Sequence, residues 1–462
     1  MMSLLHYFFL VSINGFFLVP AYGGESGDTV RFDLIHKNDP RLQRKPGLGP
    51  PTNNMEQMKQ HVHYDSQRVQ MISRAMKKRR KAEETATDDV IRAPFFSGAS
   101  VRSGHYLIPL KVGTPPQQLI MIANTASELT WMKCGSNKDE GKQVSFDPTK
   151  SSSFQTINCS STMCTQDLGD LFALGICPMP DSPCKYDYSY GAGQSVLGFF
   201  ANETLTLQMK SGTEKKMEQF LVGCNEIIEG IEENDAIDGV VGLGYSIYSF
   251  AVRGSESFGY KFSYCLVDHF SPENVRSYLV FGETRHPPHM QHTDLVLGKV
   301  LTFYGVNVVG ISLDGVMLDI PSEVWELRDD GGGTIIDEGS TLTFLAMDAY
   351  RPLMDALIKS LTKYTKYEDP RFEFCISVKP GEFNATEVPK LRIHFTGEAR
   401  MEPPVKNYVI QVDDGVRCLG FQPLPPEGGV SVIGNIMQQN MFWEFDLKTS
   451  RLGFAPSSCT DE

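Results

Sequence analysis

Short runs of alternating apolar and polar residues recur along the chain from Tyr106 onward, and they predict a mostly β protein. Turn residues bound these runs, and the plentiful glycine (41) and proline (27) favour many short strands over long helices. The predicted strands include 105–113, 118–124, 204–208, 277–281, 306–312, 334–337 and 441–446. The clearest helical pattern in this part of the chain is 346–361. A chain of 462 residues can hold two or three such domains.

An internal echo indicates that one lobe is duplicated. The apolar run and polar tip at Ile122–Ser127 recur at Ile335–Ser340. An apolar-apolar-Gly segment follows each, at Val240–Gly242 and at Val432–Gly434. The pattern predicts a strand that delivers a polar loop to an interface, with a second strand crossing beneath to hold it. Two such lobes would face each other across a cleft.

The first 23 residues have the features of a secretory signal peptide. An apolar segment at 4–19 precedes a small-x-small cleavage site at Ala21–Gly23. The alternative is a membrane anchor, but Asn14 and Gly15 interrupt the run, which is short for a bilayer span. We therefore expect a secreted protein, extracellular or apoplastic, with the vacuole as the alternative destination.

Residues 24–95 are interpreted as a prosegment. A helix is predicted over 55–81, because Val62, Val69, Ile72 and Met76 lie near helical spacing. Residues 1–92 carry 14 basic and 10 acidic side chains, whereas the remainder carries 29 and 46. A basic leader would be held on an acidic body electrostatically, and would loosen as carboxylates protonate in acid.

The prosegment is expected to be cut away, so that the mature chain starts between Ile91 and Ser100. The basic run at 77–81 is either an exposed processing site or a solvated helix face.

Charge, cysteine content and glycosylation sequons limit the kinds of partner and ligand that we expect for this chain. A formal net charge of −13 argues against nucleic acid. Ten cysteines, none in a tight metal-knuckle pair, suit an oxidising compartment better than a zinc site. Glycosylation sequons begin at Asn158, Asn202 and Asn384. We expect a monomeric glycoprotein with no metal, no cofactor and no membrane span in the mature chain.

Several characteristic motifs follow one another along residues 100–457: Gly113–Gln117, Glu128–Cys134, Phe146–Pro148, Ser151–Phe154, Tyr190–Gly193, Asp238–Gly244, Phe262–Leu266 and Ile433–Asn440. These motifs, in this order, resemble those of the pepsin-type aspartic proteases (peptidase A1). They are most similar to the plant nepenthesin-like and xylanase-inhibitor-like branch, and Arg31–His36 resembles the prosegment of that branch. The resemblance implies a bilobal, mostly β fold of two barrel-like lobes. We place the N-terminal lobe at 96–290 and the C-terminal lobe at 291–462.

The resemblance also identifies the catalytic positions. The family uses two carboxylates that share one proton across a water molecule, a case that serves as a standard example of coupled ionisation. The second carboxylate is present as Asp337, but Asn124 occupies the first position. An amide can donate a hydrogen bond, yet it cannot take the proton of the water.

Two further departures flank these positions. Ala126 replaces a glycine, and its methyl group would point toward the cleft floor. Glu338 replaces a hydroxyl residue that, in the family, bonds across to the opposite loop, whereas Thr125 could still do so. Loop support is further assigned to Ser127, Gly339 and Ser340.

The resemblance implies roles outside the loops as well. Tyr190 corresponds to the flap tyrosine that closes over substrate, with a core aromatic as the alternative. Trp131 would brace the flap or simply pack in the core, and Asp238 is interpreted as structural. The implied disulfides are Cys134–Cys224, Cys159–Cys184, Cys164–Cys177, Cys265–Cys459 and Cys375–Cys418.

Three functions follow from these observations. The sequence favours an aspartic endopeptidase family protein with strongly reduced or no proteolytic activity. One alternative is a non-catalytic binding or inhibitor protein on the same fold, and the other is an active, atypical acid endopeptidase relying on Asp337. In each case a polypeptide substrate or protein ligand would occupy the interlobe cleft, as would the chain's own prosegment.

Overall fold

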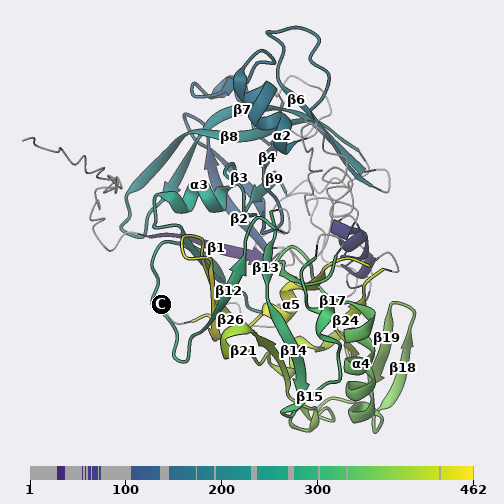
Figure 1. Ribbon diagram of the computed structural model, residues 1–462. Coiled ribbons are helices and arrows are strands. Elements are labelled where there is room, and N and C mark those ends of the chain that lie inside the picture. Colours follow the sequence, from purple (N-terminus) through teal and green to yellow (C-terminus); the bar gives the residue numbers. More distant parts are fainter. Residues whose placement is uncertain are drawn as a thin grey trace, which may run out of the picture.

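The protein is built from two β lobes that share a central sheet (Figure 1). The computed structural model describes residues 29–36, helical positions between 55 and 73, and residues 106–135, 145–172, 174–191, 194–229, 237–268, 275–299, 302–328, 331–425 and 428–460. The predicted signal peptide, the basic run at 77–81 and the expected start of the mature chain lie outside these residues. Among the described residues, no helix has the length and apolar character to cross a membrane.

The N-terminal lobe is a strongly connected sheet in which hairpins set the register. Its strands are β2 (Tyr106–Val112), β3 (Gln117–Asn124), β4 (Thr130–Lys133), β5 (Gln155–Thr156), β6 (Lys185–Gly191), β7 (Gln194–Gln208), β8 (Glu214–Glu229) and β9 (Gly239–Gly242). β2 and β3 pair antiparallel through a turn in which Gly113 has φ +97°. That backbone conformation suits glycine because it has no Cβ. The short helical pieces of the lobe are Pro148–Lys150, Met163–Leu168, α2 (Gly169–Leu171) and α3 (Phe250–Glu256).

A six-stranded antiparallel sheet joins the two lobes and also includes the N-terminal strand. Its order is β1 (Val30–His36), β11 (Ser277–Phe281), β10 (Lys261–Cys265), β26 (Met441–Asp446), β27 (Arg451–Pro456) and β12 (Gln291–Val296). Aromatic pairs fill its core, with Phe262 and Phe445 stacked at a centroid separation of 4.7 Å. β1 lies at the edge and buries Val30, Phe32 and Leu34. The segment before the lobes is therefore part of the folded core.

The C-terminal lobe contains shorter strands and a helix of 15 residues, α4. Its strands are β13 (Tyr304–Val306), β14 (Val308–Leu313), β15 (Val316–Met317), β16 (Thr334–Ile336), β17 (Thr343–Leu345), β18 (Thr365–Asp369), β19 (Phe372–Ser377), β20 (Leu391–Phe395), β21 (Arg400–Met401), β22 (Val409–Asp413), β23 (Val416–Leu419), β24 (Phe421–Pro423) and β25 (Ser431–Ile433). Its helices are α4 (Met347–Leu361) and α5 (Asn435–Gln438), with single 3-10 turns at Ser322–Val324, Ala385–Glu387, Thr396–Glu398 and Val405–Asn407. α4 agrees with the predicted helix, because Tyr350, Leu353, Leu357 and Leu361 recur at helical spacing on its buried face.

All ten cysteines are paired, but two pairings differ from those that the resemblance implied. The pairs Cys134–Cys224, Cys265–Cys459 and Cys375–Cys418 form as expected. The nested pairs are exchanged: instead of Cys159–Cys184 and Cys164–Cys177, the structure has Cys159–Cys177 and Cys164–Cys184.

Burial accounts for this correction. The helical turn at Met163–Leu168 points Cys164 inward, where Cys164 and Cys184 join one buried cluster. Cys177 is exposed and pairs with Cys159 outside that cluster. The sulfur atoms of Cys159, Cys164 and Cys177 lie within 4.8 Å of one another, so spacing along the sequence could not distinguish the two schemes. These three sulfur atoms form the one metal-like cluster among the described residues, and each is committed to a disulfide.

Candidate active site

The two echoed loops lie at the ends of equivalent strands, one in each lobe. β3 ends at Asn124 and pairs parallel with β9, so that Asn124 is opposite Gly242. β16 ends just before Asp337 and pairs parallel with β25, so that Ile336 is opposite Ile433. This is the crossing arrangement that the internal echo predicts.

Glycine is required where each crossing strand passes under its loop. A Cβ on Gly242 would lie 2.8 Å from the backbone of Glu128, and one on Gly434 would lie 2.1 Å from the carbonyl oxygen of Leu342. Side chains cannot fit at such distances, so the two apolar-apolar-Gly segments let the loop and the crossing strand pack in contact.

Asp337 is fully buried and its carboxylate accepts four hydrogen bonds. Two come from its own loop: Gly339 N–H donates to Oδ1 at 2.9 Å, and Ser340 Oγ donates to Oδ2 at 2.6 Å. The other two come from Arg68, whose Nε donates to Oδ2 and whose Nη2 donates to Oδ1, each at 2.7 Å. Both carboxylate oxygens are therefore occupied by donors.

Asn124 faces the same guanidinium group from the other lobe. Its Oδ1 accepts from Arg68 Nη2 at 3.0 Å and from the N–H of Ala126 at 2.9 Å. Because both partners are donors, the amide must present its oxygen, and not its nitrogen, to them. Asn124 thus acts here as a neutral acceptor.

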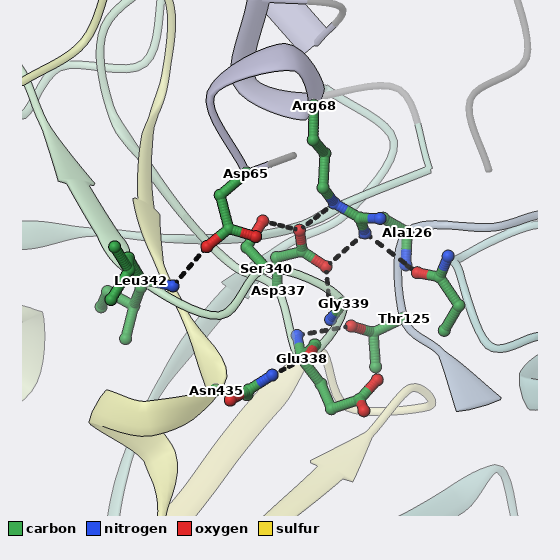
Figure 2. Close-up of polar contacts among 12 residues, drawn as sticks. Asp65, Arg68, Thr125, Ala126, Asp337, Glu338, Gly339, Ser340, Leu342 and Asn435 are labelled. Carbon is green, nitrogen blue, oxygen red and sulfur yellow. Dashed lines mark hydrogen bonds and ion pairs between the residues drawn. The ribbon is translucent and has the colours of Figure 1, made fainter. Parts of the chain in front are cut away.

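One hydrogen bond still links the two loops directly. Glu338 N–H donates to Thr125 Oγ1 at 2.9 Å, which agrees with the role expected for Thr125. The Glu338 side chain points away from Asp337 and into protein (Figure 2). Burial, and then the charge of Asp337, raise the pKa of Glu338 well above its ordinary value, although the charge of Arg68 and the backbone amides of Tyr106 and Thr125 act against this. Burial therefore favours the protonated form of this additional acid.

Arg68 belongs to a helix that sequence reasoning did not connect with the site. The helical positions between 55 and 73, which we call the N-terminal helix, lie beside the junction of the lobes (Figure 1). The Arg68 side chain is 7% exposed and forms a forked ion pair with Asp337 (Figure 2). The available signal was a charged residue directly beside Val69 and one helical turn before Ile72, on the apolar face of the predicted helix.

Apolar contacts hold the N-terminal helix against the C-terminal lobe. Its residues Met55, Met58, Val62, Val69 and Ile72 are buried in one cluster with side chains of that lobe, and Ala126 joins the same cluster. The Ala126 methyl group therefore packs among apolar neighbours. Arg371 adds a hydrogen bond from its Nη1 to the carbonyl oxygen of Met55, at 2.9 Å.

Asp65 attaches the N-terminal helix to the loop that follows Asp337. Its Oδ2 accepts from Leu342 N–H at 2.6 Å. Burial raises the pKa of Asp65 to about 7, and the smaller influence of Asp337 acts in the same direction. The backbone amides of Leu342 and Thr341 and the charge of Arg68 lower the pKa but do not overcome burial.

This raised pKa predicts that folding takes up a proton at Asp65. Its contribution to stability is present below the ordinary pKa of 3.8 and is lost as the pH rises through about 7. In that window the free energy of unfolding should fall by up to about 1.4 kcal/mol per pH unit from this group. Asp65→Asn keeps an acceptor for Leu342 and stays neutral, so its denaturation midpoints should depend less on pH than those of the unmodified chain. Parallel pH profiles would show that Asp65 does not change protonation on folding.

The other expected site residues are placed as follows. Ser127, Gly339 and Ser340 lie in the two loops, where Ser127 N–H donates to the carbonyl oxygen of Asn124 at 3.2 Å. Trp131 is buried in β4, in the core cluster of the N-terminal lobe. Tyr190 lies in β6, and the placement of its side chain is outside what the structure describes.

Asp238 has the structural role expected for it. Its Oδ2 accepts from Ile120 N–H at 2.6 Å, and its backbone N–H donates to the carbonyl oxygen of Ile120 at 2.8 Å. These bonds hold the entry to β9 against β3.

Comparison with known families identifies the arrangement. Residues 106–283 match a family model described as xylanase inhibitor N-terminal, and residues 303–456 match the corresponding C-terminal model. The chain is 35% identical to Aspartyl protease family protein 2 of Arabidopsis thaliana over 372 residues, covering 79% of this chain and 73% of that protein. The chain belongs to the plant pepsin-like aspartic protease family. It is also 29% identical to aspartic proteinase nepenthesin-2 of Nepenthes gracilis over 456 residues, covering 97% of this chain and 98% of that protein.

Solved structures agree on the two-lobed fold. A structure titled edgp aligns with a TM-score of 0.61 at 20% identity, covering 77% of this chain and 92% of that chain. Basic 7S globulin from soybean aligns with a TM-score of 0.60 at 19% identity, covering 77% and 94%. At such identities the likeness concerns the fold alone.

Proposed function

We propose that this pepsin-like protein is secreted with strongly reduced or no proteolytic activity, and that its cleft binds polypeptide without cleaving it. The observation that carries the proposal is the pairing of Asp337 with a neutral acceptor, Asn124, at the point where the two lobes meet. One carboxylate and one amide cannot share a proton between them.

The chemistry of peptide hydrolysis supports the proposal. One group must take a proton from the attacking water, while another donates a proton to the peptide carbonyl oxygen. Each of these two roles contributes about 10²–10⁴-fold to the rate. The neutral amide of Asn124 can neither take the proton of the water nor transfer a proton to the carbonyl, as a carboxyl group would. Glu338 does not substitute for the missing acid, because its side chain is directed away from Asp337 (Figure 2).

The N-terminal helix supports the interpretation of residues 24–95 as a prosegment. Arg68 occupies the carboxylate that a substrate or water would approach, and Asp65 and the apolar face fix the helix in place. The five disulfides suit an oxidising, secreted destination. Asn158 and Asn384 are exposed, as N-glycosylation requires, whereas Asn202 is partly buried.

The second candidate function is an active, atypical acid endopeptidase that relies on Asp337. The hydrogen bonds around Asp337 from Gly339 and Ser340 are in place, and the relatives named above are called proteases. This candidate requires catalysis with one carboxylate.

Self-processing distinguishes the two candidates. Purified precursor, incubated at acidic pH with contaminating proteases inhibited, is expected to keep its N-terminal segment, because the chain should not cut itself. N-terminal sequencing and intact mass would follow the reaction. Asp337→Asn, which removes the last carboxylate of the pair, is the matched control and should behave identically. Maturation of the unmodified precursor, but not of Asp337→Asn, would establish the endopeptidase.

A further inference from the structure

We propose that Asp337 and Asn124 form a binding site for the guanidinium group of an arginine side chain, which the mature protein fills with an arginine carried on a helix of a partner polypeptide. The inference rests on the proposed function, since it names the ligand of a cleft that binds without cleaving. Arg68 of the N-terminal helix occupies the site in the intact chain and shows what it accepts.

The hydrogen-bonding pattern fits a guanidinium fork. Two nitrogen atoms of Arg68 meet the two oxygen atoms of Asp337 at 2.7 Å each, and Nη2 also reaches Oδ1 of Asn124 at 3.0 Å. A planar group with parallel N–H bonds can satisfy these acceptors together, whereas a lysine ammonium offers a single point of charge.

The charge of the site matches one cation. The guanidinium group carries one positive charge and Asp337 supplies one negative charge, while Asn124 adds an acceptor without adding charge. The substitution that removes the catalytic dyad therefore leaves Asp337 and an arginine as a neutral pair, with Oδ1 of Asn124 as a third acceptor. Without a cation, Asp337 keeps the donors Gly339 and Ser340 but has no opposite charge, which favours capture of a new cation.

The surrounding backbone leaves space for the flat group. A Cβ on Gly339 would lie 2.3 Å from Nη2 of Arg68 and 2.7 Å from Oδ1 of Asn124. Any side chain at position 339 would thus occupy the place of the guanidinium group.

The helix specifies how the arginine is presented. Asp65, three residues before Arg68, accepts from Leu342 N–H, so one face of the helix makes both polar contacts (Figure 2). Val69 and Ile72 are buried in the same apolar cluster as Phe303 and Ile436. The expected partner segment is an amphipathic helix with an acid three residues before the arginine and apolar residues one and four positions after it.

Chemical complementation tests the site in the full chain. Arg68→Ala removes the part of the side chain beyond Cβ, which has the same heavy atoms as ethylguanidinium. This small cation should therefore occupy the space that the substitution leaves. At about ten times its Kd it should raise the melting temperature of Arg68→Ala by about 1–2 °C. Ethylammonium at equal concentration should give no such rise. Neither cation should stabilise the unmodified chain, whose site is filled, nor Arg68→Ala/Asp337→Asn, which lacks the carboxylate.

A peptide tests the helical presentation. A synthetic peptide of residues 55–73 should bind the Arg68→Ala chain at least about tenfold more tightly than the same peptide with alanine at that position. If Arg68→Ala does not fold alone, refolding with ethylguanidinium should give more folded protein than refolding with ethylammonium.

Equal effects of the two cations, equal binding of the two peptides, or the same stabilisation in Arg68→Ala/Asp337→Asn would overturn the inference. These outcomes are distinct from failure of the proposed function. A chain that binds ethylguanidinium and also digests protein retains the site but loses the non-catalytic assignment, whereas an inactive chain with no complementation loses only the site.

Discussion

Restoring the two catalytic loops with Asn124→Asp, Ala126→Gly and Glu338→Thr is expected to give a protein that hydrolyses denatured globin at acidic pH, whereas the unmodified protein does not. Asn124→Asp returns the carboxylate that can share a proton with Asp337. Glu338→Thr returns a hydroxyl that can reach the opposite loop and removes a buried acid beside Asp337. Ala126→Gly removes the methyl group from the first loop.

The gain should be strongly non-additive. Each acid–base role is worth about 10²–10⁴-fold, but it operates only when its partner is present and both loops are held in place. Asn124→Asp alone should therefore recover little activity, and the triple variant should exceed the sum of the single variants. Initial rates on globin, measured after removal of the N-terminal segment, would provide the comparison.

Controls separate catalysis from folding. Adding Asp337→Asn to the triple variant should abolish the restored activity, and thermal melting should show that each variant is folded. A well-folded triple variant without activity would indicate that the cleft has changed beyond the two loops, and it would favour the binding function.

Arg68→Ala is expected to release the N-terminal helix from the site. Removing one partner of a buried ion pair costs about 3–5 kcal/mol, because the remaining charge stays buried. Near the lower end of that range, the state in which the N-terminal helix is detached from the site should become about 100-fold more populated. Cleavage of this segment by a small amount of added protease should accelerate by the same factor, because at low protease opening and closing are fast relative to cleavage.

Matched substitutions on the same helix complete this test. Gln70 is exposed, so Gln70→Ala should leave the cleavage rate near that of the unmodified chain. Arg68→Lys keeps the charge but loses the fork, and its rate should lie between the two. Equal rates for Arg68→Ala and Gln70→Ala would mean that apolar packing alone holds the helix.

The fold and the loop positions were accessible from the sequence because local patterns encode them. Ile122–Ser127 and Ile335–Ser340 repeat a strand and a tip, and their crossing partners Val240–Gly242 and Val432–Gly434 repeat as well. The occupant of the site was not accessible in this way. Arg68 lies 269 residues from Asp337 in the sequence, and no local pattern records a contact over such a separation.

The exchanged disulfides and the pH behaviour of the helix were missed for related reasons. The three sulfur atoms of Cys159, Cys164 and Cys177 are close enough that only the inward direction of one turn decides the partners. From net charge alone, acid is expected to loosen the N-terminal segment, but the burial of Asp65 acts in the opposite direction. Burial of a single side chain depends on tertiary packing, which residue counts do not contain.

The most direct test of the central claim is the proteolytic activity of the unmodified protein after its N-terminal segment has been removed by an added protease and that protease inactivated. With Asn124 in place of a carboxylate, denatured globin at acidic pH should remain uncleaved above the level of the Asp337→Asn control. Robust cleavage that is blocked by an aspartic protease inhibitor, and absent from Asp337→Asn, would contradict the account.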